Sequence, residues 1–269
     1  MIDGPALLFC PGDRPERYAK AAAAADTVII DLEDAVAPAD KPRARDALLA
    51  ASLDPAKTIV RVNPATTPEF TRDLATVRRT PYRRLMLAKT ESAAQVDALA
   101  SAADGVEAIA LCETALGVVR AGEIAAHPAV IGMMWGAEDL IASMAGRTSR
   151  FTSGRYRDVA RHARSTILLA ARAYGAVAID AVHIDIADVE GLRSEAEDAA
   201  ASGFQATACI HPSQIAVIRD AYTPTPEEQA WAERVLDEAT RQPGVFRFEG
   251  RMIDEPVLRQ ARQLRRPRR

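Results

Sequence analysis

Eight short apolar runs, rich in β-branched residues, alternate along the chain with alanine-rich stretches of helical periodicity. Most of the runs are continuously hydrophobic, which is typical of strands buried on both faces of a parallel sheet. Alternating β and α elements that recur eight times within about 220 residues predict an α/β fold, a (β/α)8 TIM barrel. The predicted strands cover residues 7–10, 28–33, 59–63, 85–89, 108–113, 131–136, 181–185 and 206–211.

A doubly wound open sheet is the alternative α/β fold. It usually has about five to seven strands and a glycine-rich first turn, whereas the first turn here is Pro11-Gly12-Asp13, without a GxGxxG pattern. A loop rich in Gly, Ser and Arg at 146–155 precedes the longest barrel helix. The predicted barrel helices cover 15–25, 41–51, 68–79, 92–103, 115–126, 156–174, 189–202 and 213–221.

The end of the chain does not fit another βα unit. A helix is expected over 225–241, because Thr225, Pro226 and two following glutamates supply an N-cap, an N1 proline and an acidic first turn. A short aromatic segment at 246–252, a final helix at 255–264 and an arginine-rich, solvated tail at 265–269 follow. We therefore expect a barrel at 1–222 and a C-terminal helical extension at 223–269 that packs on the barrel or on a neighbouring subunit.

Composition and charge argue against several classes of partner. Lys and Arg number 34 against 37 Asp and Glu, and a net charge of −3 gives no reason to expect nucleic-acid or membrane binding. No apolar run reaches the ~18 residues that span a bilayer, and no basic-then-apolar leader opens the sequence, so we expect a cytoplasmic protein. The three cysteines lie in apolar runs, which predicts buried reduced thiols.

Polar residues end most of the predicted strands, and the active sites of barrels lie at the carboxyl ends of their strands. One alternative is that strand ends are polar only because they meet solvent. A whole set converging on one rim favours a site. These residues are Asp31, Glu33, Asp34, Arg61, Asn63, Lys89, Glu113, Glu138, Asp139, Asp185 and His211.

The carboxylates of this rim suggest a hard cation, because Mg2+ prefers a few carboxylate oxygens together with water and substrate oxygens. Glu113 and Asp139, at the ends of successive strands, are the predicted ligand pair. Glu33 and Asp34 are placed to hold metal-bound waters. For the strand predicted at 131–136, the alternative is that Glu138 or Asp139 only caps the following helix, as aspartate often does.

Arg61 and Lys89 are the cations of the predicted rim. A guanidinium at position 61 suits a substrate carboxylate or a developing oxyanion, and a salt bridge to Glu33 or Glu113 is a compatible alternative. Surrounding carboxylates would keep the pKa of Lys89 high, which opposes a Schiff-base role. No GxSxG, P-loop, HExxH or dinucleotide motif is present, and the four histidines form no zinc pattern.

Seven motifs lie in order along nearly the whole chain: LFCPG at 8–12, VIIDLEDAV at 28–36, VRVN at 60–63, ETALG at 113–117, WGAEDL at 135–140, IHPSQI at 210–215 and MIDEP at 252–256. Together they resemble the citrate lyase β-subunit-like proteins of the HpcH/HpaI aldolase family. The resemblance is greatest to stand-alone actinobacterial members, related to malyl-CoA, citramalyl-CoA and β-hydroxyacyl-CoA lyases. One departure is Ala88, where relatives often carry proline before the residue that matches Lys89.

The resemblance implies a TIM barrel that is usually trimeric, with Mg2+ held by Glu113 and Asp139. It also implies that Asp254 enters the site of a neighbouring subunit as the acid/base, although the residues alone would make Asp254 a helix N-cap. Arg61 is implied to contact the substrate acyl group. The residues implied to line the substrate carboxylate pocket with their backbone are Gly136, Ala137 and Glu138, and those implied to bind coenzyme A are Phe9, Arg14 and Lys20.

We therefore expect a Mg2+-dependent carbon–carbon lyase that cleaves or forms a β-hydroxyacyl-CoA thioester through an acetyl-CoA enolate. Its expected catalytic residues are Asp254, Arg61 and Glu33, and its expected assembly is a homotrimer. Two alternatives use the same site: a CoA thioesterase or malate-synthase-like enzyme, and a metal-dependent aldolase on free keto acids. A third is a non-catalytic or partner-dependent subunit of a citrate lyase complex. The sequence does not name the acyl group.

Overall fold

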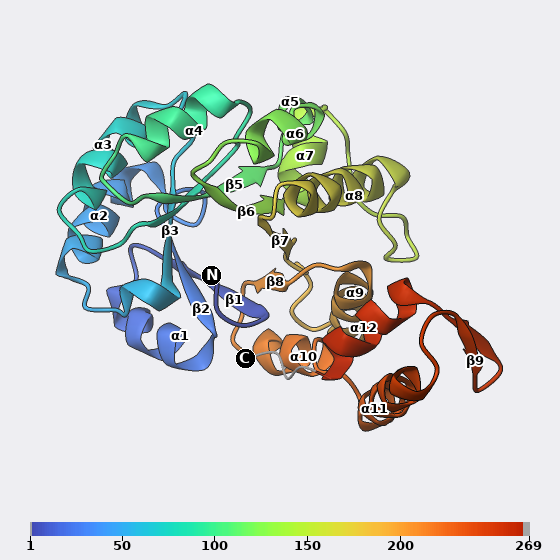
Figure 1. Ribbon diagram of the computed structural model, residues 1–269. Helices are drawn as coiled ribbons and strands as arrows, with labels where there is room; N and C mark the ends of the chain where they lie inside the picture. The colour runs from blue at the N-terminus through green and yellow to red at the C-terminus, as the bar shows by residue number, and fades with distance from the viewer. Residues whose placement is uncertain (1, 266–269) are drawn as a thin grey trace. The chain divides into compact units, whose positions relative to one another are not determined.

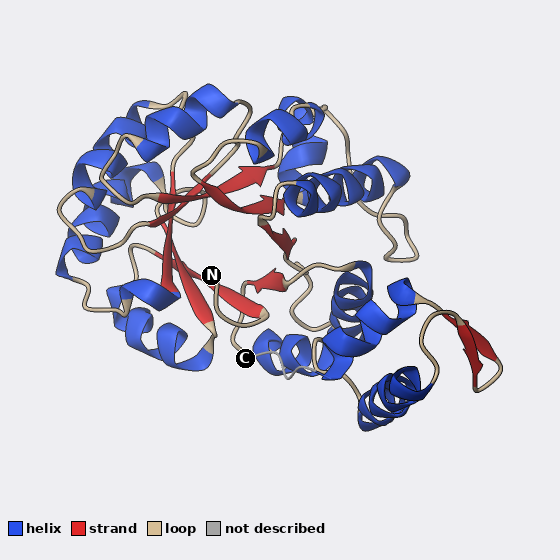
Figure 2. Cartoon of the chain, in the orientation of Figure 1, coloured by secondary structure: helices blue, strands red, loops and turns tan. Residues whose placement is uncertain are grey.

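The computed structural model describes residues 2–265, and within them the predicted TIM barrel is confirmed. Eight parallel strands pair in chain order, and β1 also pairs with β8, so the sheet closes on itself (Figures 1 and 2). The arginine-rich tail lies outside the described residues from position 266 onward. The strands are β1 (Ala6–Pro11), β2 (Thr27–Asp31), β3 (Thr58–Val62), β4 (Arg84–Leu87), β5 (Glu107–Cys112), β6 (Val130–Trp135), β7 (Val177–Asp180) and β8 (Ala206–Cys209).

The barrel interior is filled by aliphatic side chains from all eight strands. Because successive side chains of a strand point to opposite faces, every second residue enters this interior. Each large aliphatic side chain that is fully buried contributes about 1.5–3 kcal/mol through the area it removes from water. The buried strand residues of this cluster are Leu7, Ile29, Ile59, Met86, Ile109, Leu111, Met134, Ile179, Ala206 and Ala208.

Helices surround the closed sheet, as the blue coils around the red strands of Figure 2 show. Their order matches the predicted pattern, although the stretch predicted as one helix at 115–126 is two short helices that meet at Arg120. The barrel helices are α1 (Tyr18–Ala24), α2 (Lys41–Ala50), α3 (Pro68–Val77), α4 (Ala93–Ala100), α5 (Ala115–Val119), α6 (Ala121–Ala125), α7 (Ala137–Ser143), α8 (Asp158–Ala173), α9 (Val189–Ser202) and α10 (Gln214–Ala221). Short 3-10 turns lie at Pro15–Arg17, Pro38–Asp40 and Pro55–Lys57.

The predicted position of the seventh strand is wrong. The strand was expected at 181–185, but β7 covers Val177–Asp180, and Asp180 rather than Asp185 ends it. Val182 and Ile184 lie beyond the end of the strand and line a cavity at the barrel mouth. Apolar residues in such a loop imitate a buried strand in the sequence, because a short apolar run has the same pattern in both cases.

Residues after Arg219 form a second compact unit with its own core. It contains α11 (Pro226–Arg241), a hairpin of β9 (Phe246–Phe248) and β10 (Arg251–Ile253), and α12 (Glu255–Arg265). The side chain of Thr225 and that of Glu228 cap α11 reciprocally, in agreement with the cap expected there. Its buried core comprises Ala232, Val235, Phe246, Ile253, Leu258 and Ala261. Packing of this extension on a neighbouring subunit stays a prediction.

Cys10, Cys112 and Cys209 are free thiols, and all are buried, as predicted. Burial raises the pKa of Cys10 to about 11 and that of Cys209 to about 12, so both stay protonated near neutral pH. Over residues 2–265, none of the helices is both long enough and apolar enough to cross a membrane.

Candidate active site

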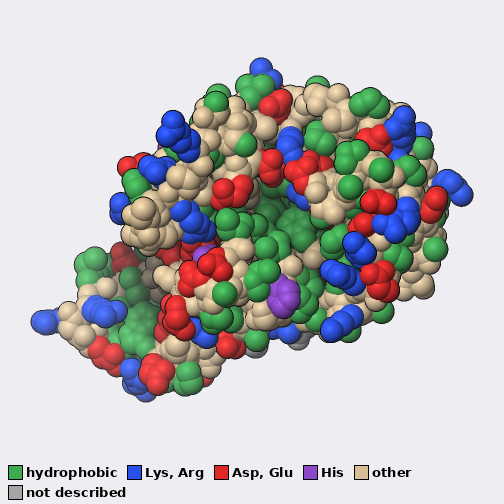
Figure 3. All heavy atoms as spheres, turned by 180° about the vertical axis from the view of Figure 1, so that it is seen from behind, with side chains coloured by type: hydrophobic (Ala, Val, Ile, Leu, Met, Phe, Trp, Pro, Cys, Tyr) green, Lys and Arg blue, Asp and Glu red, His purple; other side chains and the backbone are tan. Residues whose placement is uncertain are grey.

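A cavity of about 180 Å³ lies at the carboxyl ends of the barrel strands. Figure 3 shows a hollow on one face of the barrel, with hydrophobic side chains on its floor and acidic and basic side chains along its rim. The polar residues come from the ends of β2, β3 and β5 and from the start of α7. The cavity is lined by Phe9, Asp31, Ala35, Arg61, Leu111, Glu113, Met134, Gly136, Ala137, Glu138, Asp139, Val182, Ile184 and Ile210.

Arg61 is held in one orientation by two carboxylates and an aromatic ring. Its Nε lies 2.7 Å from Asp31 Oδ1 and its Nη2 lies 2.6 Å from Asp31 Oδ2, while Nη1 is 3.2 Å from Glu33 Oε2. The guanidinium carbon also lies 4.8 Å from the centre of the Phe9 ring. A guanidinium has five N–H donors, and three of them face these two carboxylates. Two donors are therefore left for a ligand in the cavity.

Lys89, just beyond β4, lies among four carboxylates. Its Nζ is 2.5 Å from Glu33 Oε1, 2.9 Å from Asp34 Oδ2 and 3.3 Å from Asp139 Oδ1. The fourth, Glu113 Oε1, lies 4.0 Å from Nζ and also accepts a hydrogen bond of 3.1 Å from the Lys89 backbone N–H. The structure thus brings together the five charged residues that the sequence placed separately on the ends of four strands.

The charge states of this cluster follow from its burial. Burial, reinforced by the neighbouring Asp139 carboxylate, raises the pKa of Glu113 to about 8. Burial alone would lower the pKa of Lys89, but its contacts with Glu33, Glu113 and Asp34 outweigh this effect and raise the pKa above its usual value. A permanently charged ammonium is a poor nucleophile, which argues against a Schiff-base role for Lys89, as expected from the sequence.

Glu113 and Asp139 fit a magnesium site by the chemistry of their donors. The side chain of Glu113 is 4 % exposed and that of Asp139 is 35 % exposed, so one oxygen donor is buried and the other reaches the open side of the cavity. Mg2+ is typically bound by one or two carboxylates and keeps several waters or substrate oxygens. Among the described residues, no group of three or more His, Cys, Asp and Glu forms a fuller ligand cage.

The start of α7 is built around Glu113. The N-cap of α7 is Gly136, with no side-chain cap, so neither Glu138 nor Asp139 has the capping role considered as the alternative. A Cβ at Gly136 would lie 2.7 Å from Glu113 Oε2, and only glycine permits this close approach. Glu138 accepts a 2.6 Å hydrogen bond from Ser149, which ties α7 to the following loop.

The residues expected to bind coenzyme A and the expected acid/base lie in two places. Phe9 lines the cavity, and Arg14 and Lys20 follow on the exposed turn and helix after the same strand. Arg14 Nε is 3.7 Å from Asp13 Oδ2. Asp254 belongs to the C-terminal unit, where its Oδ1 accepts a 3.2 Å hydrogen bond from the backbone of Val257 at the start of α12. That contact is the cap that the residues alone suggested, and a catalytic role for Asp254 stays a prediction.

Asp31 is the site residue whose role sequence reasoning missed. The sequence places Asp31 at a strand end but does not predict its pairing with Arg61. The two residues are register partners, since Asp31 ends β2 and Arg61 lies one position before the end of β3, so two adjacent strands carry opposite charges at the same end. That coincidence was a usable signal, because residues at matched ends of neighbouring parallel strands lie side by side.

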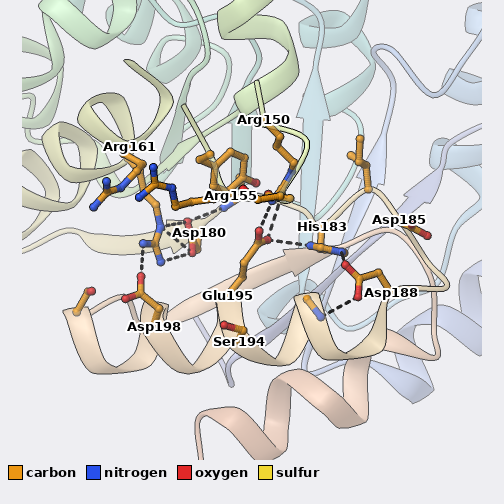
Figure 4. A pocket seen from close by; sticks show the side chains of 18 of the residues that line it. Arg150, Arg155, Arg161, Asp180, His183, Asp185, Asp188, Ser194, Glu195 and Asp198 are labelled. Carbon is orange, nitrogen blue, oxygen red and sulfur yellow. Dashed lines mark hydrogen bonds and ion pairs between the residues drawn. The ribbon is translucent and has the colours of Figure 1, made fainter. Parts of the chain in front are cut away.

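A larger cavity, of about 790 Å³, lies between the loop around Tyr156, α8 and α9 (Figure 4). Its charged groups are largely paired with one another: Arg150 with Glu195, and Arg164 with both Asp180 and Asp198. Arg150, Arg155 and Arg161 lie on the wall opposite α9, which carries Glu195 and Asp198. Paired charges are already satisfied, so we regard the smaller cavity, with its free Arg61 donors and clustered carboxylates, as the candidate active site.

His183 lines the larger cavity, and the strand predicted at 181–185 would place it mid-strand. It lies instead in the loop after β7, where it is buried. Its Nδ1 is 2.9 Å from Glu195 Oε2, and its Nε2 is 3.4 Å from Asp188 Oδ2. His183 therefore packs between two carboxylates and fastens this loop to α9.

Comparison with known proteins gives consistent matches. The family profile described as HpcH/HpaI aldolase/citrate lyase matches residues 6–212. A citrate lyase subunit beta-like protein of Mycobacterium tuberculosis is 60% identical over 258 residues, covering 96% of this chain and 93% of the relative. A (3S)-malyl-CoA thioesterase of Cereibacter sphaeroides is 36% identical over 267 residues, covering 96% of this chain and 92% of the relative.

A solved structure extends the match to three dimensions. The crystal structure of protein CitE from Mycobacterium tuberculosis, in complex with magnesium, acetoacetate and coenzyme A, has a TM-score of 0.94 and 58% sequence identity. The match covers 97% of each chain, so it includes the barrel and the C-terminal unit alike.

Proposed function

The chain belongs to the HpcH/HpaI aldolase/citrate lyase family, and from this premise we propose that it is a Mg2+-dependent carbon–carbon lyase acting on a β-hydroxyacyl-CoA thioester. The proposed reaction is cleavage to acetyl-CoA and a keto acid, or the reverse condensation. The finding that carries it is the cavity in which Arg61, Glu113 and Asp139 meet. Magnesium and coenzyme A in the related crystal structure support the choice of cofactor and substrate class.

Glu113 and Asp139 are the residues proposed to hold Mg2+. When bound there, the ion would supply Lewis-acid polarisation of the oxygens of the keto-acid half and would neutralise its carboxylate. Gly136, Ala137 and Glu138 line the same cavity, and their backbone N–H groups would position that carboxylate at the N-terminus of α7. A helix N-terminus favours an anionic group through its free N–H donors.

Cleavage breaks the bond between the carbinol carbon and the carbon next to the thioester, and its electron pair becomes the enolate of acetyl-CoA. Arg61 would donate its two free N–H groups to the enolate oxygen. Glu33, whose pKa burial raises, would take the hydroxyl proton through an ordered water. Asp254 would deliver a proton to the enolate carbon, which completes acetyl-CoA.

Coenzyme A is proposed to lie over the end of β1. Phe9 would contact the acyl end, and the exposed side chains of Arg14 and Lys20 would reach the phosphates of the nucleotide. Both cations are solvent-facing and near one another in the chain, which suits a polyanionic, partly exposed ligand. We further propose that the protein assembles as a homotrimer in the cytoplasm, with Asp254 supplied by a neighbouring subunit.

Thioester hydrolysis is the second candidate, because a relative that covers 96% of this chain is a (3S)-malyl-CoA thioesterase. Hydrolysis would need only a water placed at the thioester carbon within the same cavity. A third possibility is a subunit that acts only with an acyl-carrier partner. The cluster of Arg61, Glu113 and Asp139 is intact, which favours an active enzyme over a decayed one.

Product analysis by mass spectrometry separates these candidates. The isolated protein would be incubated with Mg2+ and a panel of malyl-, citramalyl-, citryl- and hydroxymethylglutaryl-CoA. A lyase yields acetyl-CoA and a keto acid, whereas a thioesterase yields free coenzyme A and the intact hydroxy acid. If no member of the panel yields acetyl-CoA or free coenzyme A, both activities are contradicted. The partner-dependent subunit is then the remaining candidate.

A further inference from the structure

Lys89 contacts several charged residues of the candidate active site, but the proposed reaction gives it no role. Its ammonium lies within 4.0 Å of oxygens from Glu33, Asp34, Glu113 and Asp139. The other cation at the mouth, Arg61, contacts Asp31 with two of its nitrogens and Glu33 with the third. Among the described residues, Lys89 is therefore the one cation that pairs with Asp34, Glu113 and Asp139.

The backbone of Lys89 is as unusual as its side chain. Its φ angle is +51°, in the left-handed region that residues other than glycine rarely adopt. In this conformation the backbone N–H donates to Glu113 Oε1 while the side chain extends to Glu33 and Asp34. A strained conformation persists only where its surroundings impose it, and such positions cluster at functional sites.

The neighbours of Lys89 fix this conformation. Ala88 is fully buried, and the Thr90 hydroxyl donates a 2.7 Å hydrogen bond to the carbonyl of Leu87. The backbone N–H of Thr90 donates to the carbonyl of Leu111 on β5. Hydrogen bonds of the flanking residues to β4 and β5 therefore fix the backbone of Lys89. The contacts of its side chain follow from this backbone conformation.

We propose that Lys89 is the resident counter-ion of the metal site, with which Mg2+ competes for the charge of Glu113 and Asp139. Its backbone N–H positions Glu113, and its ammonium keeps the carboxylates together before the metal arrives. Lys89 therefore lowers the affinity for Mg2+ and stabilises the metal-free protein. This proposal rests on the metal pair of the proposed function.

The test compares Mg2+ binding by calorimetry and the melting temperature of the metal-free protein. Lys89→Met removes the ammonium and keeps the length of the side chain. We expect Mg2+ to bind about tenfold more tightly, equivalent to about 1.4 kcal/mol, since a competing charge is gone. Without metal, the variant should have a lower melting temperature than the native protein. Saturating Mg2+ should make this difference in melting temperature smaller.

Two control variants separate this role from a general effect of charge. Lys57→Met changes the net charge equally, but Lys57 is exposed and precedes β3 at the opposite end of the barrel. It should leave Mg2+ binding unchanged. Lys89→Arg keeps the positive charge and should bind Mg2+ with nearly native affinity. If Lys89→Met binds Mg2+ with unchanged or lower affinity than the native protein, the proposal is wrong.

A second variant covers the case in which Lys89→Met does not fold, since it leaves Asp34, Glu113 and Asp139 without a cation. The double variant Lys89→Met with Asp34→Asn removes one of them, and it should bind Mg2+ more tightly than Asp34→Asn alone. Equal affinities in that pair would also overturn the proposal. Failure of the native protein to bind Mg2+ would instead contradict the metal site of the proposed function, so the two failures are distinguishable.

Discussion

Asp31 shows how one buried residue can organise a site without lining much of it. Its two oxygens accept hydrogen bonds from Arg61 and from the backbone N–H groups of Glu33 and Ala35. The same carboxylate therefore orients the guanidinium and shapes the turn that carries Glu33. A buried ion pair of this kind is costly to break, because the remaining partner keeps an uncompensated charge.

Exchange of Asp31→Asn should lower both stability and turnover. The loss of stability should be about 3 kcal/mol, measured by denaturant unfolding, because Arg61 stays buried without a full counter-charge. Turnover should fall more than substrate affinity, since Arg61 is proposed to act on the enolate. Asp73→Asn is the matched control: Asp73 is also buried and paired with Arg45, outside the cavity lining. Equal losses of turnover in both variants would remove Asp31 from a positioning role.

Exchange of Glu113→Gln should weaken Mg2+ binding and lower kcat/KM at least about 100-fold, since it removes one of few anionic donors. The fold should persist, because a neutral side chain replaces a carboxyl whose pKa of about 8 already reflects its burial. Glu107→Gln is the control, at the opposite end of the same strand. Calorimetry with Mg2+ gives the result, and native affinity in Glu113→Gln would exclude Glu113 as a ligand.

At the scale of elements, the loop after β7 links the two cavities. Ile184 lines both of them, while His183 turns toward Glu195 on α9. Glu195 also binds Arg150, so one carboxylate ties the loop after α7 and the loop after β7 to α9. We expect these contacts to keep the apolar side of the candidate site in place.

The Glu195 contacts predict a dependence of stability on pH. Burial would raise the pKa of Glu195, but its bonds with His183 and Arg150 outweigh this and lower it below the usual value. The charged form is therefore stabilising above the unfolded pKa of about 4.3, and the effect is lost as the pH falls through the lower folded pKa.

Exchange of Glu195→Gln should accordingly cost about 2 kcal/mol at pH 7, within the range for hydrogen bonds to charged groups. The difference from the native protein should shrink as the pH falls below about 4, as measured by urea unfolding at several pH values. Glu197→Gln, at an exposed position of the same helix, should show neither effect. A difference that grows toward acidic pH would contradict the assigned sign.

At the scale of the whole molecule, the proposed acid Asp254 and the proposed metal pair belong to different compact units. Asp254 caps α12 with its side chain, and asparagine caps a helix about as well as aspartate. Asp254→Asn should therefore leave the melting temperature almost unchanged, while turnover falls by about 10²–10⁴-fold through the loss of proton transfer.

Subunit mixing tests whether the site is shared between copies of the chain. Asp254→Asn mixed with Glu113→Gln should regain activity, because some sites in a mixed trimer would combine an intact barrel with an intact Asp254. Glu113→Gln suits this test better than Arg61→Ala, which would leave Asp31 buried and unpaired. If mass spectrometry verifies the exchange and no activity returns, Asp254 acts within its own subunit or has no catalytic role.

The sequence alone determined the barrel, the order of its elements and the family. These follow from local patterns, because continuous apolar runs, helical periodicity and caps such as that of α11 depend on residues close together in the chain. The ends of the strands also predicted several of the charged residues that share one rim, although Asp185 lines the larger cavity instead. The roles proposed for these residues are not decided by the fold and stay predictions.

Only the tertiary structure decided where β7 lies, which carboxylate holds Arg61, and how Lys89 reaches Glu33, 56 positions away along the chain. Each depends on the register between strands and on the path of a loop, which follow from packing of the closed sheet as a whole. Apolar residues at 182 and 184 look the same in a sequence whether they face a core or a cavity. Whether they face a core or a cavity depends on the residues that closure of the barrel brings next to them.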